Sequence, residues 1–195
     1  MEKDKKKSIL FLDHDSVICL SNNWGGRKKK WSKYRSANPD SSPNIKEAPV
    51  LVRFDDFDKK AVKILNEIIE ETGCEIVVSS DWKRWATVEE MGEYYESKGI
   101  IKKPIAFTDS ILYDDYDDFP WHNKSELEQT RSLEIAQYIG QNPVITHWVA
   151  IDDLNMSLTD VDGKTWGLKN FVLTPEDKEG IKQTGIKEKV LEYLL

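Results

Sequence analysis

Residues 9–17 read ILFLDHDSV, and this stretch decides the fold that we expect for the whole chain. The apolar run Ile9–Leu12 shows no polar alternation, which is typical of a strand buried on both faces of a parallel sheet. Asp13 and Asp15 follow at once, and unpaired carboxylates are costly inside a sheet. We therefore expect both just past the carboxyl end of the strand, where open α/β sheets bind ligands. In the structural alternative, the two carboxylates only bind backbone amides in a turn.

Length and composition predict an ordinary globular protein of one domain. The chain has 195 residues, of which 39% are hydrophobic and 32% charged. Its net charge of −7 argues against a generally basic surface for binding nucleic acid but allows local basic patches. Cys19 and Cys74 lie in or beside apolar runs and are predicted to be reduced thiols. No apolar segment reaches the roughly 18 residues of a membrane span, and residues 1–7 do not resemble a signal peptide. We expect a soluble cytoplasmic protein with no membrane partner.

The chain after residue 57 predicts alternating helices and strands. Asp58 is an N-cap and Gly73 a C-terminal stop for a helix with an apolar stripe, and a second buried-strand pattern at 75–80, ending in two hydroxyls, follows it directly. Strand, helix and strand in succession predict a right-handed parallel unit. The further elements that we expect are a helix at 87–98 with a Thr87–Glu90 capping box, strands at 104–108, 147–151 and 170–174, and helices at 125–140 and from about 179.

Residues 18–57 form a predicted insertion beside the Asp13 loop. We interpret most of this tract as irregular, with a loop at 38–44 and a short strand or hairpin arm at 50–54. Residues 27–35, RKKKWSKYR, are the most basic stretch of an acidic protein. Cations that meet phosphates and aromatic rings that stack on bases would make this stretch a nucleic-acid or nucleotide grip. The candidate substrate-binding residues are Lys28, Lys29, Lys30, Trp31 and Tyr34. The alternative is a solvated loop.

Polar groups follow three of the predicted strands. Asp13 with Asp15, then Ser79, then Asp152 with Asp153 should meet at one sheet edge. Such a group of acidic oxygens needs a cation, and Mg²⁺ suits hard oxygen ligands. A phosphate ligand would also need a basic residue, for which Arg131 and Lys124 are the candidates.

Each of these residues has a structural alternative. Ser79 could cap a turn, and Asp152 with Asp153 could cap a helix. The acidic run 114–118 is predicted to be a solvated loop rather than a metal site. His14, His122 and His147 lack metal-ligand spacing, and we expect packed or solvated side chains for them.

The order of these motifs resembles the haloacid dehalogenase-like (HAD) phosphohydrolase superfamily. The matching segments are DHDSV at 13–17, Ser79 at a strand end, a basic residue at 131 or 124, and the acidic pair 152–153. More narrowly, VSSDWK at 78–83, RSLEI at 131–135, WVAIDD at 148–153 and FVLTP at 171–175 resemble the HAD domain of "Swiss Army knife" RNA-repair proteins. The resemblance implies a Rossmann-like α/β fold with a small cap-like insertion after the first strand. The basic tract at 27–35 matches no motif of the family.

The resemblance also implies a reaction and roles for residues. Asp13 would attack phosphorus and form an aspartyl-phosphate, while Asp15 would act as general acid and then general base. Mg²⁺ would be held by Asp13, Asp15 through its backbone carbonyl, Asp152 and Asp153. Ser79 and Arg131, or Lys124, would bind the phosphoryl oxygens.

We therefore expect a Mg²⁺-dependent phosphatase acting on nucleic-acid end phosphates or nucleotides, with a ligase or kinase as a candidate partner. The alternatives are a small-metabolite phosphatase and a catalytically weak nucleic-acid-binding module with the same fold. A glycosyltransferase or a metal nuclease would also place carboxylates at strand ends, but neither accounts for Ser79 and Arg131. The sequence does not fix the oligomeric state.

Overall fold

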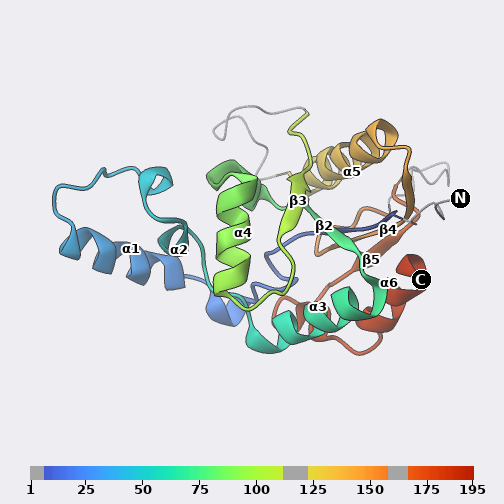
Figure 1. The fold of residues 1–195 in the computed structure, drawn as a ribbon, viewed down its shortest axis with the longest axis horizontal. Helices are drawn as coiled ribbons and strands as arrows, with labels where there is room; N and C mark the ends of the chain where they lie inside the picture. The colour runs from blue at the N-terminus through green and yellow to red at the C-terminus, as the bar shows by residue number, and fades with distance from the viewer. Residues whose placement is uncertain (1–6, 112–122, 158–166) are drawn as a thin grey trace, which may run out of the picture.

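The computed structural model describes residues 7–111, 123–157 and 167–195, and its centre is a parallel sheet (Figure 1). The strand order is β3-β2-β1-β4-β5, and every neighbouring pair is parallel. The strands are β1 Lys7–Leu12, β2 Glu75–Val78, β3 Pro104–Phe107, β4 Ile145–Asp152 and β5 Phe171–Leu173. This doubly wound α/β arrangement is the fold class predicted from the sequence.

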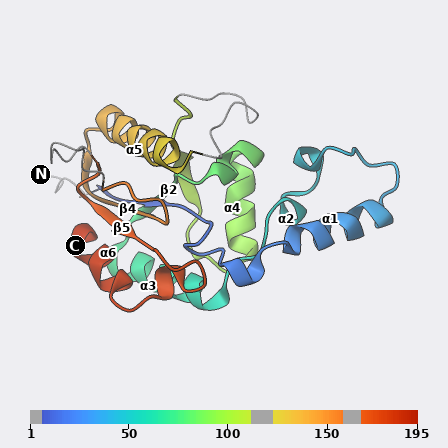
Figure 2. The same ribbon diagram turned by 180° about the vertical axis from the view of Figure 1, so that it is seen from behind.

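Strand β1 lies at the centre of the sheet because both of its faces are apolar. Leu10 and Leu12 belong to the core that the sheet forms with α3 (Lys59–Thr72), α4 (Val88–Ser97) and α6 (Ile186–Leu194). Ile9 and Phe11 point to the opposite face, where the helix α5 (Lys124–Gln141) contributes Ile135 to a second, smaller core. Figure 2 shows α5 on one side of the sheet and α3 with α6 on the other. The predicted doubly buried strand is confirmed.

The predicted helix signals are also confirmed. The Asp58 carboxylate accepts the backbone N–H groups of Lys60 and Ala61 at the start of α3, both at 2.9 Å. Gly73 ends this helix in the left-handed conformation, with φ of 67°. The Thr87–Glu90 capping box opens α4.

The segment between β1 and α3 differs most from expectation. Residues 26–37 form the helix α1 (Gly26–Ala37), which the sequence did not reveal because it buries no residue and has no apolar stripe. The predicted strand at 50–54 is wrong, since Val50–Arg53 is the short helix α2. Val50, Arg53 and Phe54 are buried while Leu51 is exposed, a spacing that belongs to a helix. Figure 1 shows α1 and the loop after it extending to one side of the sheet. Short 3₁₀ helices lie at Ser21–Asn23, Ile45–Glu47 and Asp81–Trp85.

The carboxyl-terminal helix begins later than expected. A 3₁₀ helix, Gly180–Lys182, precedes α6, and Gly185 separates the two. Gly180 has φ of 53°, and its backbone lies against the loop that follows Asp15. A Cβ atom on Gly180 would come within 2.3 Å of the Val17 carbonyl oxygen and 2.8 Å of that of Ser16. The Ile181 N–H donates to the same Val17 carbonyl at 3.0 Å. Gly180 is therefore required for the close approach that supports this loop.

Cys19 and Cys74 are both buried free thiols. Within the described ranges, no helix has the length and apolar character that crossing a membrane requires.

We expect Gly180→Ala to lower the free energy of unfolding by about 2–4 kcal/mol, because a left-handed backbone penalty adds to an overpacked contact. Gly185→Ala is the matched control, since Gly185 also has positive φ (86°) but nothing lies within 4 Å of its added Cβ. The control should lose only about 1 kcal/mol. Urea unfolding measures both variants, and equal losses would contradict the close-approach argument.

Candidate active site

Two neighbouring strands carry the acidic residues of the site. Asp13 follows β1, Asp152 is the last residue of β4, and Asp153 comes next. Strands β1 and β4 lie side by side, and the strand order reverses between them. In open α/β sheets, this reversal leaves a crevice at the carboxyl ends of the strands. The structure thus brings these three aspartates together at the ligand-binding edge.

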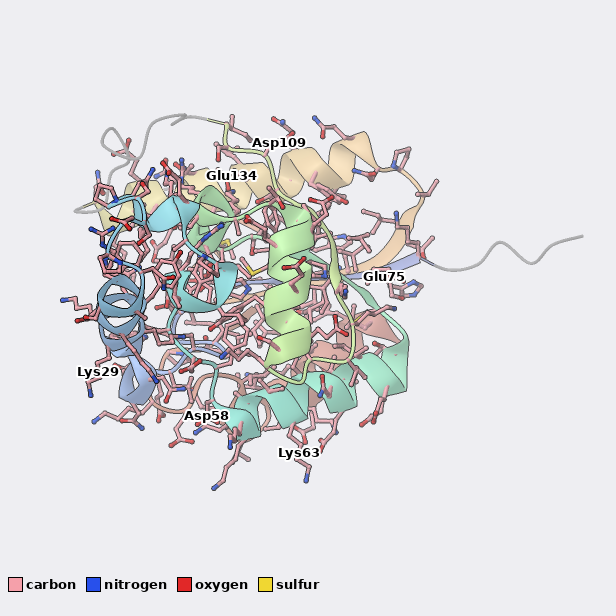
Figure 3. The ribbon with its side chains drawn as sticks, turned by 60° about the vertical axis from the view of Figure 1, so that its left-hand side comes forward. Lys29, Asp58, Lys63, Glu75, Asp109 and Glu134 are labelled. Atoms are coloured by element: carbon pink, nitrogen blue, oxygen red, sulfur yellow. The ribbon has the colours of Figure 1, made fainter. Side chains whose placement is uncertain are left out.

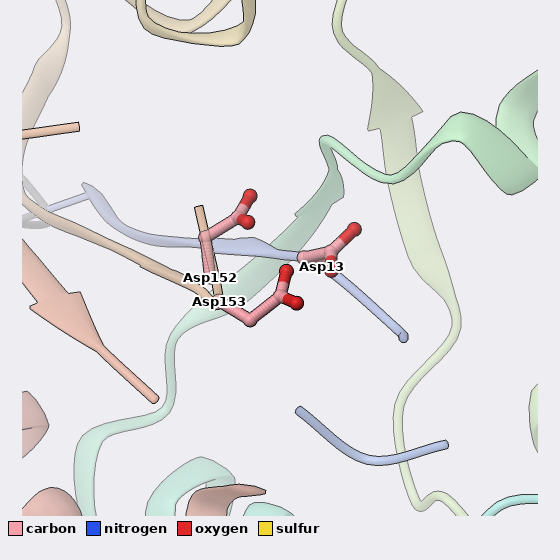
Figure 4. A group of neighbouring side chains, drawn as sticks. All are labelled: Asp13, Asp152 and Asp153. Carbon is pink, nitrogen blue, oxygen red and sulfur yellow. The ribbon is translucent and has the colours of Figure 1, made fainter. Parts of the chain in front are cut away.

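Asp13, Asp152 and Asp153 form a compact carboxylate cluster (Figure 4). One oxygen from each lies within 4.8 Å of the others, and Asp13 and Asp152 are 2% and 0% exposed. Burial and repulsion from Asp152 raise the pKa of the Asp13 carboxyl well above its ordinary value. Burial raises the pKa of Asp152 to about 6 and also raises that of Asp153. Ionisation of all three carboxyl groups is therefore unfavourable in these surroundings.

Arg131 supplies the positive charge inside this cluster. Its Nη1 donates to Asp13 at 2.8 Å and to Asp152 at 2.9 Å, while Nη2 donates to Asp81. The guanidinium is buried, and it comes from the middle of α5. Lys124 begins the same helix with its side chain 70% exposed, and lies 3.9 Å from Glu128. The structure brings Arg131 to the aspartates and leaves Lys124 at the surface.

Asp15 is placed by a tight turn after β1. The His14 carbonyl accepts the N–H groups of Val17, Ile18 and Cys19, and Ser16 adopts the left-handed conformation with φ of 59°. This turn buries His14, whose Nε2 lies 2.6 Å from the Tyr95 hydroxyl, and leaves Asp15 exposed. Desolvation by the surrounding protein raises the pKa of the Asp15 carboxyl, and a hydrogen bond from Trp82 Nε1 at 2.9 Å opposes that rise. His14 is the packed histidine that the sequence predicted, whereas His122 lies outside the described residues, as does the acidic run 114–118.

The two serines after β2 have different surroundings. Ser79 N–H donates to the Leu12 carbonyl at 3.1 Å, which places Ser79 beside the end of β1. Its buried hydroxyl has no hydrogen-bond partner among the described residues. The Ser80 hydroxyl accepts the N–H of Trp82 and caps the next 3₁₀ helix. Ser79 is therefore the serine with unused hydrogen-bonding capacity.

A cavity of about 300 Å³ opens over the cluster, and Asp13, Asp15, Arg131 and Asp153 line it. Asp81, Trp82 and Arg27 also line it, and sequence reasoning did not assign them to the site. Asp81 and Trp82 directly follow the Ser79–Ser80 strand end, so the strand-end argument could have found them. Arg27 lies in the basic tract, but only the tertiary structure places it over Asp15.

Of the predicted substrate-binding residues on α1, only Lys28 lines one of the two cavities over the cluster. Lys28 lines a second cavity that adjoins the first, whereas Lys29 is exposed on the outer side of the helix (Figure 3). Lys30 forms a salt bridge with Asp56 at 3.2 Å. Trp31 and Tyr34 stack on each other, with ring centroids 5.8 Å apart, and neither lines the two cavities over the cluster.

Strand order, the aspartates at the switch point and the buried arginine define a haloacid dehalogenase-like α/β domain. The family model described as "HAD domain in Swiss Army Knife RNA repair proteins" matches residues 9–185. The chain therefore belongs to this family. Neither curated proteins nor solved structures gave a match in the corresponding comparisons.

Members of this superfamily use Mg²⁺, and the carboxylate cluster fits such an ion. Its donors are hard oxygens, which Mg²⁺ prefers. Burial raises the pKa values of Asp13 and Asp152, and repulsion from neighbouring aspartates adds to this rise. A divalent cation would relieve the repulsion. Asp13, Asp152 and Asp153 are the residues that would hold it.

We expect Asp153→Asn to have opposite effects on stability with and without divalent cations. Without them, the variant should be more stable than wild type, because one of three mutually repelling acidic groups is neutralised. With Mg²⁺ at 100 times its dissociation constant, wild type should gain about 2.7 kcal/mol, and the variant should lose most of this gain.

Unfolding midpoints in a chelator and in a Mg²⁺ series measure both effects. Asp40→Asn, an exposed aspartate in the loop after α1, is the control that should change neither. A Mg²⁺ gain in Asp153→Asn equal to that of wild type would exclude Asp153 as a ligand.

Proposed function

We propose that this protein is a Mg²⁺-dependent phosphohydrolase that works through an aspartyl-phosphate. The observation that carries the proposal is the meeting of Asp13, Arg131 and the Asp152–Asp153 pair at the switch point of the sheet. A carboxylate nucleophile needs a fixed orientation and a positive environment for the transferring phosphoryl group. Arg131 supports both, because it holds Asp13 Oδ1 at 2.8 Å and carries a buried positive charge.

The proposed reaction has two steps. In the first, Asp13 Oδ2 bonds to phosphorus while the bond from phosphorus to the leaving oxygen breaks, and Asp15 protonates that oxygen. In the second, water attacks phosphorus, Asp15 takes the proton of this water, and the bond between Asp13 and phosphorus breaks. The raised pKa of Asp15 suits this exchange of roles, because its carboxyl group holds a proton more readily than an ordinary aspartate does.

Ser79 and Arg131 are the proposed phosphate ligands. The buried Ser79 hydroxyl has no partner among the described residues and lies beside the end of β1, which supports it as the donor to a phosphoryl oxygen. When bound by Asp13, Asp152, Asp153 and the Asp15 backbone carbonyl, Mg²⁺ supplies further charge neutralisation at the phosphoryl group.

The proposed substrate is a nucleic-acid end phosphate, with a nucleotide second. The family's description as a domain of RNA-repair proteins supports this class, and so do Arg27 and Lys28 beside the acidic site. A phosphate-release screen over nucleotides, sugar phosphates and end-phosphorylated RNA and DNA tests it. Turnover confined to sugar phosphates would favour a small-metabolite phosphatase. Nucleic-acid binding without phosphate release would favour a catalytically weak binding module.

We expect Asp13→Asn to lower phosphate release by about 10⁴-fold or more, because removing a covalent nucleophile leaves only binding and electrostatic contributions. Phosphate release in Mg²⁺ measures this loss, and circular dichroism checks that the fold is kept. Undiminished turnover would rule out Asp13 as the nucleophile.

The effect of Asp15→Asn should depend on the leaving group. An alkoxide leaving group needs protonation, so kcat/KM for a nucleoside phosphate should fall by about 10²–10⁴. An aryl phosphate releases a stable phenolate and should lose far less. The comparison uses kcat/KM because this parameter covers only the steps through the first irreversible transfer. Equal losses on both substrates would contradict the general-acid role.

A further inference from the structure

Trp24 is an exposed aromatic residue held in a fixed orientation beside the site. Its side chain is 50% exposed, yet its indole Nε1 donates to the Cys19 carbonyl at 3.3 Å. Cys19 closes the turn that carries Asp15. The indole is thus tied to the same backbone turn as the proposed general acid while much of its surface stays open to solvent.

Trp24 lines the second cavity, of about 470 Å³, together with Arg27 and Lys28. Asp15, Arg27 and Trp82 line both this cavity and the one over the carboxylate cluster. A ligand whose phosphate occupies the first cavity can therefore extend directly into the second.

Asp55 fixes the chain where the second cavity meets α1. Its carboxylate accepts the backbone N–H groups of Gly25 at 3.2 Å and Arg27 at 2.6 Å. Gly25 has φ of 85°, which lets the chain turn sharply into the helix. Asp55 therefore keeps Trp24, Arg27 and Lys28 next to one another at the start of α1.

Arg27 and Lys28 are cations that line the second cavity, where Arg27 helps to oppose the rise in the pKa of Asp15. Within residues 7–111, 123–157 and 167–195, neither side chain forms a salt bridge, whereas Lys30 pairs with Asp56. Asp15, Asp55 and Asp153 line the same cavity, so an anionic ligand depends on these two cations for its attraction. An aromatic platform beside two cations is the combination that binds single-stranded nucleic acid.

We propose that Trp24, Arg27 and Lys28 form a subsite for the nucleotides behind the scissile phosphate. The base of the terminal nucleoside stacks on Trp24, and the next phosphodiester binds Arg27 and Lys28. This subsite selects single-stranded nucleic-acid ends of two or more nucleotides over mononucleotides. The proposal rests on the proposed phosphatase function for the terminal phosphate.

The test compares two substrates in each variant: a short single-stranded oligonucleotide carrying the end phosphate that wild type hydrolyses, and acetyl phosphate, which has no ring to stack. Trp24→Ala should lower the ratio of kcat/KM for the oligonucleotide to that for acetyl phosphate by about tenfold. Trp24→Phe should restore most of this ratio, because a phenyl ring also stacks. A ratio in Trp24→Ala equal to that of wild type would overturn the subsite.

The cations are tested by binding. In the Asp13→Asn background, fluorescence anisotropy of a labelled oligonucleotide measures affinity across a salt series. Arg27→Gln with Lys28→Gln should weaken binding and reduce the slope of log affinity against log salt by about 0.7 for each phosphate that is no longer neutralised. Lys33→Gln, an exposed cation on the same helix, should leave both unchanged. An unchanged slope in the double variant, or an equal weakening in Lys33→Gln, would overturn the assignment.

The outcomes separate the two proposals. Tight, Trp24-dependent binding without phosphate release from any substrate would overturn the proposed function and support the subsite. Phosphate release that is indifferent to Trp24, Arg27 and Lys28 would support the function and overturn the subsite.

Discussion

The ion pairs of Arg131 are the interaction on which the site depends. One buried guanidinium joins Asp13 after β1, Asp152 at the end of β4 and Asp81 after β2. Burying this many charges is expensive, and such clusters contribute little net stability. Without Arg131, the aspartates would face one another in a desolvated crevice. The proposed function would explain the cluster, because a site for a divalent cation and a phosphate must carry charge that the protein alone tolerates poorly.

A second buried ion pair, between Lys83 and Glu134, joins the same two elements as the Asp81–Arg131 ion pair. Lys83 Nζ lies 2.5 Å from Glu134 and 3.0 Å from the Thr108 hydroxyl, and both charged side chains are 4% exposed. Burial lowers the pKa of Lys83 and raises that of Glu134. Lys83 lies two residues after Asp81 along the chain, and Glu134 lies three after Arg131. The pair therefore fixes the 3₁₀ helix against α5, and the Asp81–Arg131 contact joins the same two elements.

In our proposal, the segment between β1 and α3 gives the site its selectivity among phosphate esters. The sheet edge supplies aspartates, a serine and an arginine, which suit any phosphate ester. Recognition of substrate length and of the bases would have to come from elements outside this sheet edge. Asp55 holds the start of α1 beside the cavity through two backbone N–H groups. Lys30 and Lys98 both pair with Asp56 and so tie α1 to the end of α4.

The sequence by itself determined the parallel sheet, because short unbroken apolar runs such as 9–12 alternate with helix patterns and are typical of strands covered on both faces. It also determined which strand ends carry Asp13, Ser79 and the 152–153 pair, since polar residues must leave the core where a strand stops. Only the tertiary structure showed that Arg131 reaches the aspartates and that Lys124 does not, because Lys124 lies two turns earlier, at the exposed start of α5. The structure also showed that Trp24 and Arg27 lie beside the site. The sequence could not show this, because α1 has no apolar periodicity and is positioned by long-range contacts with Asp55 and Asp56.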